Sequence, residues 1–303
     1  MNRRDFLGAL SAGLVIPPFT NAAAARHPLG VQFFAFAGGR ALPWDEFSRA
    51  MEAARGIGFD GLQLAGLMGH EPARIRRRAE ELGLAMRSMH MGNDQVRAFR
   101  APGGPIGDAQ DATYTPIGMV QVARVNLPLA RDLGCEWGMI AASGVSNFTS
   151  VDSIRRMADA LNRCDEIAAG MGLKLSYHNH AADFTPVAGQ VPYDILLANT
   201  HSRIRFELDV CYVRAGGSDP VAVIERNPDR VASFHLKDID AKGVQATPGD
   251  GILDFAAIQR AASRVPDPLY YLEVNVPPGG DPLAEVTKGY RHLHALGWGT
   301  RTA

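Results

Sequence analysis

The stretch V-D-S-I-R-R-M-A-D-A-L-N-R-C-D-E-I-A-A-G-M-G-L-K-L-S-Y-H, residues 151 to 178, contains one repeating unit of the fold. In its first part, 151 to 171, apolar residues recur at three- and four-residue spacing, which predicts an amphipathic helix. Gly172 is a helix stop signal, and the apolar run Leu173 to His178 predicts a buried strand. The same alternation of helix and strand extends through the chain in both directions.

Eight segments of the chain have the pattern of short buried strands. They are Gly30 to Phe36, Gly61 to Ala65, Ala85 to His90, Trp137 to Ala142, Leu173 to His178, Ile204 to Asp209, Ala232 to Leu236 and Tyr270 to Val274. Four more amphipathic stretches predict helices, at Trp44 to Gly56, Glu71 to Leu82, Thr115 to Leu133 and Pro282 to Leu296. Eight strand–helix alternations over about 270 residues indicate an α/β fold, a (β/α)8 TIM barrel formed as a single domain over residues 26–303.

The composition of the 303-residue chain excludes several classes of protein. Apolar residues make up 46 % and charged residues 21 %, which is typical of a globular domain with a large core. The 31 Lys and Arg against 32 Asp and Glu leave no excess positive charge for a phosphate backbone, so we expect no nucleic-acid partner. Cys135, Cys164 and Cys211 are odd in number and widely spaced, so no disulfide is expected.

The first 25 residues have the pattern of an export signal. Arg3 and Arg4 precede a short apolar stretch, Leu10 to Ile16, and the small-residue run Ala22 to Ala25. The adjacent arginines followed by x-Phe-Leu resemble the twin-arginine signal, and a general secretory signal with a chance arginine pair is the alternative. The apolar stretch is too short to span a membrane, and no Cys follows the small residues. We therefore expect a cleavable signal over 1–25, a periplasmic protein and no membrane anchor.

Ionisable residues gather at the ends of the predicted strands, where TIM barrels build their active sites. Four of them come from four consecutive strand ends: His178, Asp209, His235 and Glu273. Each is separated from the next by 31, 26 and 38 residues, about one βα unit, so the four donors can meet at one point. Two imidazoles and two carboxylates suit Mn, Fe, Co or Zn better than Mg. The sequence therefore predicts a divalent-metal site, although each residue alone would more often be structural.

At these positions the sequence resembles the sugar phosphate isomerase/epimerase family, the xylose-isomerase-like barrels. The motifs that carry the resemblance are G-F-D-G-L-Q-L at 58 to 64, Y-H-N-H-A-A-D-F at 177 to 184, F-E-L-D-V-C-Y-V-R-A-G-G-S-D-P at 206 to 220, F-H-L-K-D at 234 to 238, G-D-G-I-L-D-F at 249 to 255 and Y-L-E-V at 271 to 274. The family typically holds its metal with a Glu, an Asp, a His and a second Glu. Asp209, His235 and Glu273 match this set, and His178 stands in the place of the first Glu.

The presence of His178 in place of a Glu bears on the chemistry that the resemblance implies. Epimerases and isomerases of the family move a proton between adjacent carbons with two Glu residues, whereas elimination next to a ketone needs one base. Exported members with Y-H-N-H resemble enzymes that act on 3-keto-glycosides. The resemblance thus implies a periplasmic, metal-dependent enzyme that enolises a keto-sugar or 3-keto-glycoside, with elimination, isomerisation or epimerisation as the outcome. Two questions stay open at this point. One is whether a partner oxidoreductase supplies the keto-sugar, and the other is whether the protein assembles into a homo-oligomer.

Within this hypothesis, Asp209, His235 and Glu273 are metal ligands, and His178 is the fourth ligand or the general base. Glu273 is also expected to take part in catalysis. Lys237 is a candidate electrophile or hydroxyl-binding group, and the alternative is a solvated pair with Asp238.

Further residues are candidates for substrate binding, each with a structural alternative. His90, His180 and Arg214 could contact the substrate, while Trp44, Phe34 and Phe36 could stack on a sugar ring or pack in the core. Gly249-Asp250-Gly251 is expected to form a structural turn. Two alternative functions remain: an endonuclease-IV-like metal-dependent hydrolase, which the near-zero net charge disfavours, and a non-catalytic sugar-binding module.

Overall fold

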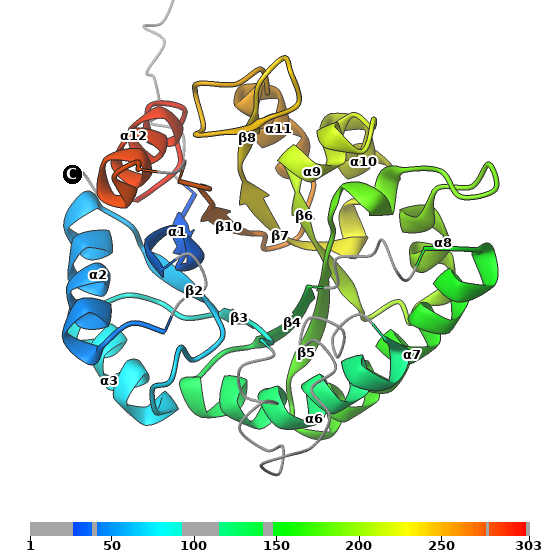
Figure 1. Ribbon diagram of the computed structural model, residues 1–303, viewed down its shortest axis with the longest axis horizontal. Helices are drawn as coiled ribbons and strands as arrows, with labels where there is room; N and C mark the ends of the chain where they lie inside the picture. Colours follow the sequence, from blue (N-terminus) through cyan, green and yellow to red (C-terminus); the bar gives the residue numbers. More distant parts are fainter. Residues whose placement is uncertain (1–26, 38–40, 93–114, 142–147, 277–278, 301–303) are drawn as a thin grey trace, which may run out of the picture.

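The computed structural model describes residues 27–37, 41–92, 115–141, 148–276 and 279–300. Eight parallel strands close into a barrel in the order β1-β10-β7-β6-β5-β4-β3-β2, and helices surround them (Figure 1). The predicted (β/α)8 barrel is therefore confirmed. The export signal predicted over 1–25 lies outside the described residues.

Each barrel strand lies within or close to the segment predicted for it. The strands are β1 Gly30–Gln32, β2 Gly61–Ala65, β3 Ser88–His90, β4 Trp137–Ala141, β5 Lys174–His178, β6 Arg205–Asp209, β7 Val231–Leu236 and β10 Leu269–Leu272. An antiparallel pair, β8 Asp238–Ile239 and β9 Gln245–Ala246, follows β7.

The longer helices also follow the prediction closely, because a left-handed glycine stops several of them where the sequence signals it. The helices are α1 Phe34–Ala37, α2 Trp44–Ile57, α3 Pro72–Leu82, α6 Pro116–Leu133, α7 Val151–Gly170, α8 Pro192–Asn199, α9 Val210–Ala215, α10 Pro220–Arg226, α11 Phe255–Ala262 and α12 Pro282–Ala295, with 3-10 turns at Ala181–Phe184 and Pro228–Arg230. No helix in the described ranges has the length and apolar character that crossing a bilayer requires.

The first strand is shorter than predicted. It ends at Gln32, and Phe34–Ala37 form the short helix α1 instead of continuing the strand to Phe36. The side-chain Oε1 of Gln32 accepts a hydrogen bond from the backbone N–H of Phe34 at 3.1 Å, which stabilises the start of this turn. A short apolar run does not distinguish strand from helix, so the prediction could not place this boundary.

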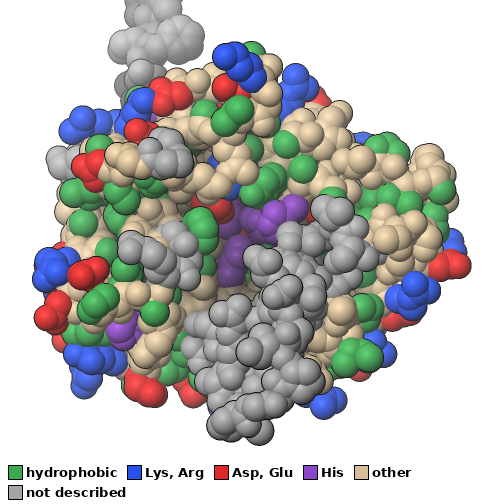
Figure 2. Space-filling model, in the orientation of Figure 1, with side chains coloured by type: hydrophobic (Ala, Val, Ile, Leu, Met, Phe, Trp, Pro, Cys, Tyr) green, Lys and Arg blue, Asp and Glu red, His purple; other side chains and the backbone are tan. Residues whose placement is uncertain are grey.

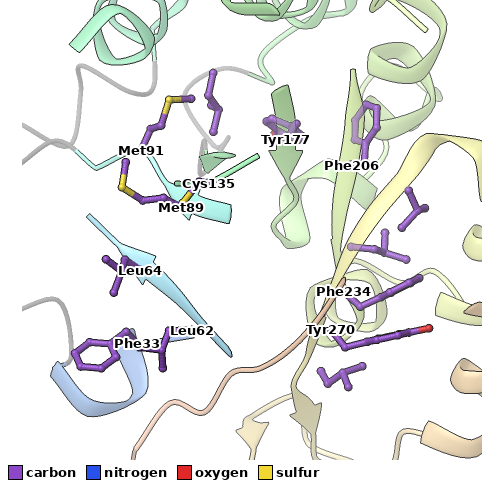
Figure 3. Close-up of a cluster of buried hydrophobic side chains, with 14 of the residues drawn as sticks. Phe33, Leu62, Leu64, Met89, Met91, Cys135, Tyr177, Phe206, Phe234 and Tyr270 are labelled. Atoms are coloured by element: carbon purple, nitrogen blue, oxygen red, sulfur yellow. The ribbon is translucent and has the colours of Figure 1, made fainter. Parts of the chain in front are cut away.

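Alternation along the strands gives the barrel an apolar outer face and a mostly polar inner face. Leu62, Leu64, Tyr177, Phe206 and Phe234 belong to the outer core, and Figure 3 shows them. The inner face carries polar side chains on the strands and directly after them: Gln32, Gln63, Ser88, His90, Ser176, His178, Glu207, Asp209, Ser233, His235, Lys237 and Glu273. This polar interior differs from the branched aliphatic layers common in TIM barrels.

A small apolar cluster fills the barrel at the end where the strands begin. It consists of Trp137, Ala232, Leu269 and Tyr271, which are all buried. The cysteines Cys135, Cys164 and Cys211 are also buried and are free, as the sequence predicts. The polar side chains therefore face the opposite end, where the strands finish.

Asp238 anchors the loop that follows β7. Its side chain is 1 % exposed, and Lys237 before it is fully buried, so the alternative of a solvated pair is wrong. The Asp238 carboxylate accepts four backbone hydrogen bonds of 2.9 to 3.1 Å, from the N–H groups of Ile239, Gly249, Gly251 and Leu253. The glycines at 249 and 251 thus belong to a structural turn, as predicted.

Replacing Asp238 by Ala is expected to lower the free energy of unfolding by at least about 3 kcal/mol, because four donors lose their acceptor and a hydrogen bond to a charged group contributes roughly 1.5–3 kcal/mol where water cannot replace it. Urea denaturation measures this change. Asp159→Ala, at an exposed position of α7, serves as the control and should stay within about 0.5 kcal/mol of the parent. A loss of less than about 1 kcal/mol for Asp238→Ala would contradict the anchoring role.

Candidate metal centre

Three of the four predicted ligands lie together where the strands end. Donor atoms of Asp209, His235 and Glu273 are all within 4.8 Å of one another. Asp209 is paired in register with His235 on the neighbouring strand, and Glu273 directly follows β10 on the other side of β7. Figure 2 shows histidine side chains in a hollow at the centre of this face.

The chemistry of this three-residue set fits a metal ion. Of the described residues' buried polar atoms, Asp209 Oδ2 and His235 Nδ1 are among the few without a hydrogen-bond partner. His235 Nδ1 lies 2.5 Å from Glu273 Oε2, yet the two are not aligned as a hydrogen bond. A buried polar atom without a partner costs roughly 1–3 kcal/mol, and a shared cation would remove that cost. One imidazole and two carboxylates suit Mn, Fe, Co or Zn.

Asp209 is held so that one of its oxygens stays available. Its Oδ1 caps helix α9 by accepting the backbone N–H of Tyr212 at 2.9 Å. Its own backbone N–H donates to Asn179 Oδ1 at 3.0 Å. Burial raises the pKa of Asp209 to about 7, against the opposing charge of Lys237. Asp209 thus becomes ionised near neutral pH, with Oδ2 free to bind a cation.

Glu207 lies on the other side of the His235 ring. Its Oε1 is 3.1 Å from His235 Nε2 and 2.7 Å from His90 Nε2. Its Oε2 accepts from Gln63 Nε2 at 2.7 Å and Ser233 Oγ at 3.0 Å. Burial opposes its charge, but the neighbouring His235 and His90 hold the pKa of Glu207 well below its usual value. A metal-bound His generally orients its other N–H toward a carboxylate or another acceptor, and here Gln63 Oε1 lies 2.6 Å from His235 Nε2 with the Glu207 carboxylate beside it.

Lys237 provides a buried positive charge next to the three-residue set. Its Nζ is 2.8 Å from Glu273 Oε1 and 4.6 Å from the centre of the Tyr212 ring. Burial disfavours the charge, but the carboxylates of Glu273 and Asp209 outweigh it and raise the pKa of Lys237 above its usual value. Lys237 is therefore a fixed cation at the place where an electrophile was predicted.

His178 belongs to a second group of donors. This group shares His235 with the first and adds His90 and Glu207, and its donor atoms also lie within 4.8 Å of one another. His178 Nδ1 is 3.3 Å from Glu207 Oε1. Burial lowers the pKa of His178 well below its usual value, so the ring is neutral at pH 7. Its roles as fourth ligand or general base both stay predictions.

A cavity of about 220 Å³ opens beside both groups of donors. Its lining is largely polar and consists of Gln32, Phe34, Ala65, His90, Ala141, His178, His180, Tyr212, Glu273 and Asn275. The predicted substrate-binding residues His90 and His180 are both part of it. Burial lowers the pKa of His180 to about 4, and its Nδ1 is one of the buried polar atoms without a partner in the described chain. This cavity is large enough to admit a sugar-sized ligand beside the donors.

Two other predicted substrate-binding residues do not line this cavity. The Trp44 ring stacks on Phe47 at 5.8 Å, and the Arg74 guanidinium lies 3.9 Å from its centre. Trp44 therefore packs within α2 and α3, which is the structural alternative stated for it. Arg214 is exposed in the last turn of α9. The placement of both residues gives no support to the predicted substrate contacts.

The prediction did not include Glu207, Gln63 or Tyr212 in the site. A signal for the first two exists in the sequence. Alternation puts Glu207 on the same face as Asp209, and Gln63 is the one polar residue within the apolar run 61–65. Gln63 links His235 to Glu207, because its Oε1 is 2.6 Å from His235 Nε2 and its Nε2 donates a hydrogen bond to Glu207.

Metal affinity at this site should rise steeply with pH. Burial disfavours the His235 imidazolium, but Glu207 and Glu273 outweigh it and raise the pKa of His235 to about 10. Below pH 7 both His235 and Asp209 hold protons, so each bound metal displaces about two, and between pH 7 and 10 only the His235 proton is displaced. The association constant should therefore increase roughly hundredfold per pH unit below pH 7 and roughly tenfold per unit above it.

Calorimetric titration with Zn²⁺ at pH 6 and pH 8, in two buffers of different ionisation enthalpy, counts the protons released. A proton count near zero at both pH values, or equal affinities at pH 6 and 8, would contradict this ligand set.

Comparison with known proteins agrees with this architecture. The model of the xylose isomerase-like TIM barrel family matches residues 51–296. An inosose dehydratase of Geobacillus kaustophilus (strain HTA426) is 22% identical over 244 aligned residues, with 67% of this chain and 71% of that protein covered. A sugar phosphate isomerase/epimerase structure from Parabacteroides distasonis ATCC 8503 has a TM-score of 0.71 and 20% identity, with 88% of this chain and 98% of that chain covered.

The structure of the IOLI protein with a bound zinc atom superimposes with a TM-score of 0.65 and 13% identity, covering 89% of this chain and 97% of that chain. At these identities the two structures show a shared fold. The family match extends over most of the chain and includes every strand from β2 to β10. The chain therefore belongs to the xylose isomerase-like TIM barrel family.

Proposed function

We propose that this protein is a divalent-metal-dependent enzyme that enolises a 3-keto-glycoside and expels the substituent on the β carbon. The observation that carries this proposal is the buried set of Asp209, His235 and Glu273, with the cation Lys237 beside it, next to a polar cavity. A homologue found by sequence is named an inosose dehydratase, and loss of water next to a ketone is an elimination of the same kind. The replacement of a Glu by His178 also favours elimination over two-carboxylate proton transfer.

The chain's own residues can supply the required groups. When bound, a divalent metal contributes Lewis acidity toward a carbonyl oxygen. Lys237 adds a fixed positive charge for the oxygen that becomes negative. His90 lines the cavity with its Nε2 2.7 Å from Glu207 Oε1, and we assign its other ring nitrogen, Nδ1, as the base that takes the proton from the carbon next to the ketone. His178 is the alternative base, as the sequence predicts.

Tyr212 is the group that we assign as the proton donor. It lines the cavity, and its hydroxyl accepts a hydrogen bond from Gln245 Nε2 at 3.1 Å. Burial raises the pKa of Tyr212, so the hydroxyl keeps its proton at neutral pH and can give it to the leaving oxygen. A base and an acid on separate side chains suit an elimination.

The location in the cell is part of the same proposal. The twin-arginine-like pattern within residues 1–25 supports export to the periplasm. Phosphorylated sugars are scarce there, which favours a free keto-sugar or a glycoside as the substrate, supplied by an oxidoreductase.

The experiment is incubation of protein loaded with Mn²⁺, Co²⁺ or Zn²⁺ with methyl 3-keto-glucoside in D₂O. We expect release of methanol and deuterium at C2 of the recovered substrate by NMR, and neither after removal of the metal by a chelator. Binding of the sugar without exchange and without methanol release would instead indicate a sugar-binding module. Cleavage of DNA at abasic sites would favour the endonuclease-IV-like alternative.

A further inference from the structure

A second cavity, of about 360 Å³, lies next to the polar one. Phe34 and Asn275 line both cavities, so the two share a wall. The other lining residues are apolar: Ala35, Phe36, Ala37, Val274, Val276 and Pro282. We call this second cavity the apolar annex.

The barrel topology explains why the apolar annex adjoins the metal centre. Strands β1 and β10 pair in parallel, so the segments that follow them, α1 and residues 273–276, emerge side by side. Glu273, one of the three candidate ligands, directly precedes Val274 of the annex. A ligand bound at the donor set therefore has the annex as its immediate neighbour.

We propose that the apolar annex binds the leaving group of the substrate, and that this leaving group is an apolar, ring-containing aglycone. This inference rests on the proposed function. The annex exceeds the about 150 Å³ in which an apolar cavity binds benzene, so a single aromatic ring fits. Phe34, which is 37% exposed, lines both cavities and supplies an aromatic side chain to the shared wall.

A second sugar ring would be a poorer occupant of the annex. Its several hydroxyl groups would face mostly apolar side chains, and the one polar side chain of the lining, Asn275, can pair with only a few of them. An apolar ring has no hydroxyl groups to be stripped of water, and its binding buries apolar surface. The lining thus favours an aryl or alkyl glycoside over a disaccharide.

The reaction with such a substrate balances without an oxidant. The base removes the C2 proton next to the C3 ketone, and the C–H electron pair forms the C1–C2 double bond. The bond from C1 to the aglycone oxygen breaks, and that oxygen takes a proton from Tyr212. The products are an unsaturated keto-sugar and the free alcohol of the aglycone.

The test compares benzyl and methyl 3-keto-glucosides, whose alcohols are leaving groups of similar acidity. We expect kcat/KM for the benzyl compound to be higher by about tenfold or more, since even one methylene in an apolar pocket changes it by roughly tenfold. Phe34→Ala and the near-isosteric Val276→Thr should each reduce the benzyl-to-methyl ratio. Ile252→Ala, an exposed apolar side chain outside both cavities, should leave both rates unchanged.

A second readout does not depend on turnover. Calorimetry with unoxidised benzyl glucoside should show binding that is weaker in Phe34→Ala. If methyl and benzyl compounds react equally, if a 3-keto-disaccharide is preferred, or if the benzyl preference survives both substitutions, the assignment of the annex is wrong while the proposed function stands. If neither keto-glucoside releases its alcohol or exchanges deuterium, the proposed function fails, and the calorimetric result alone then decides whether the annex binds an apolar ring.

Discussion

Asp209→Asn is expected to leave a folded barrel that binds divalent metal roughly a thousandfold more weakly and exchanges keto-glycoside protons at least roughly a thousandfold more slowly. Asparagine has the size of aspartate, and its side-chain oxygen can still accept the N–H of Tyr212 and cap α9. What the substitution removes is the charged oxygen, Oδ2, that has no protein partner. The loss should therefore appear in metal binding and in catalysis together.

The stability of the metal-free variant distinguishes a ligand from a structural carboxylate. The pKa of Asp209 is raised from 3.8 to about 7 by burial, so the folded protein holds this proton more tightly than the unfolded chain does. Stability is consequently lost as pH rises through this range, and above pH 7 the ionised Asp209 destabilises the metal-free fold. Asp209→Asn should then be as stable as the parent at pH 8, or more stable.

Mass-spectrometric metal analysis, calorimetry and urea denaturation check these expectations, with the exposed Asp159→Asn as the matched control. Wild-type metal content in Asp209→Asn would overturn the ligand assignment, and so would a marked loss of stability without metal at pH 8.

Glu207→Gln is expected to weaken metal binding by roughly 10- to 100-fold once the affinities are corrected for the protons that the metal displaces, the usual effect of removing the carboxylate behind a metal-binding His. Glutamine keeps the volume but removes the charge that faces His235 Nε2. Gln63 Oε1, 2.6 Å away, still accepts the proton on His235 Nε2, but without the carboxylate's charge that proton is held less firmly, which leaves Nδ1 less available to a metal. The same substitution removes the carboxylate partner of His90, so proton exchange should fall as well.

The proton count separates this positioning role from a general structural one. Glu207 is one of the carboxylates that raise the pKa of His235, so Glu207→Gln should lower that pKa toward neutrality. Fewer protons are then released per metal at pH 8 than in the parent. Glu225→Gln, an exposed carboxylate on α10, is the matched control. An unchanged metal affinity together with an unchanged proton count in Glu207→Gln would refute the role assigned to Glu207.

The strands were predictable because burial in the barrel wall requires runs of apolar residues. The length and spacing of these runs can be read from the local sequence. The strand ends were predictable for the same reason, and with them the positions of Asp209, His235 and Glu273. The end of β1 was not predictable, because the short apolar run Phe34 to Ala37 is compatible with either a strand or a helix. Trp44 and Arg214 were predicted to contact the substrate, yet Trp44 packs against Phe47 and Arg214 faces solvent.

By itself, the sequence determined that eight strand–helix units form a closed barrel and that metal-binding side chains gather at one end of it. Both properties follow from local periodicity and from the direction of parallel strands. Only the tertiary structure decided which donors meet. The register shift in the pairing of β6 and β7 sets Asp209 opposite His235, and closure of the barrel brings Gln63 to Glu207, 144 residues away. These contacts depend on register and on the barrel's diameter, which no local pattern encodes.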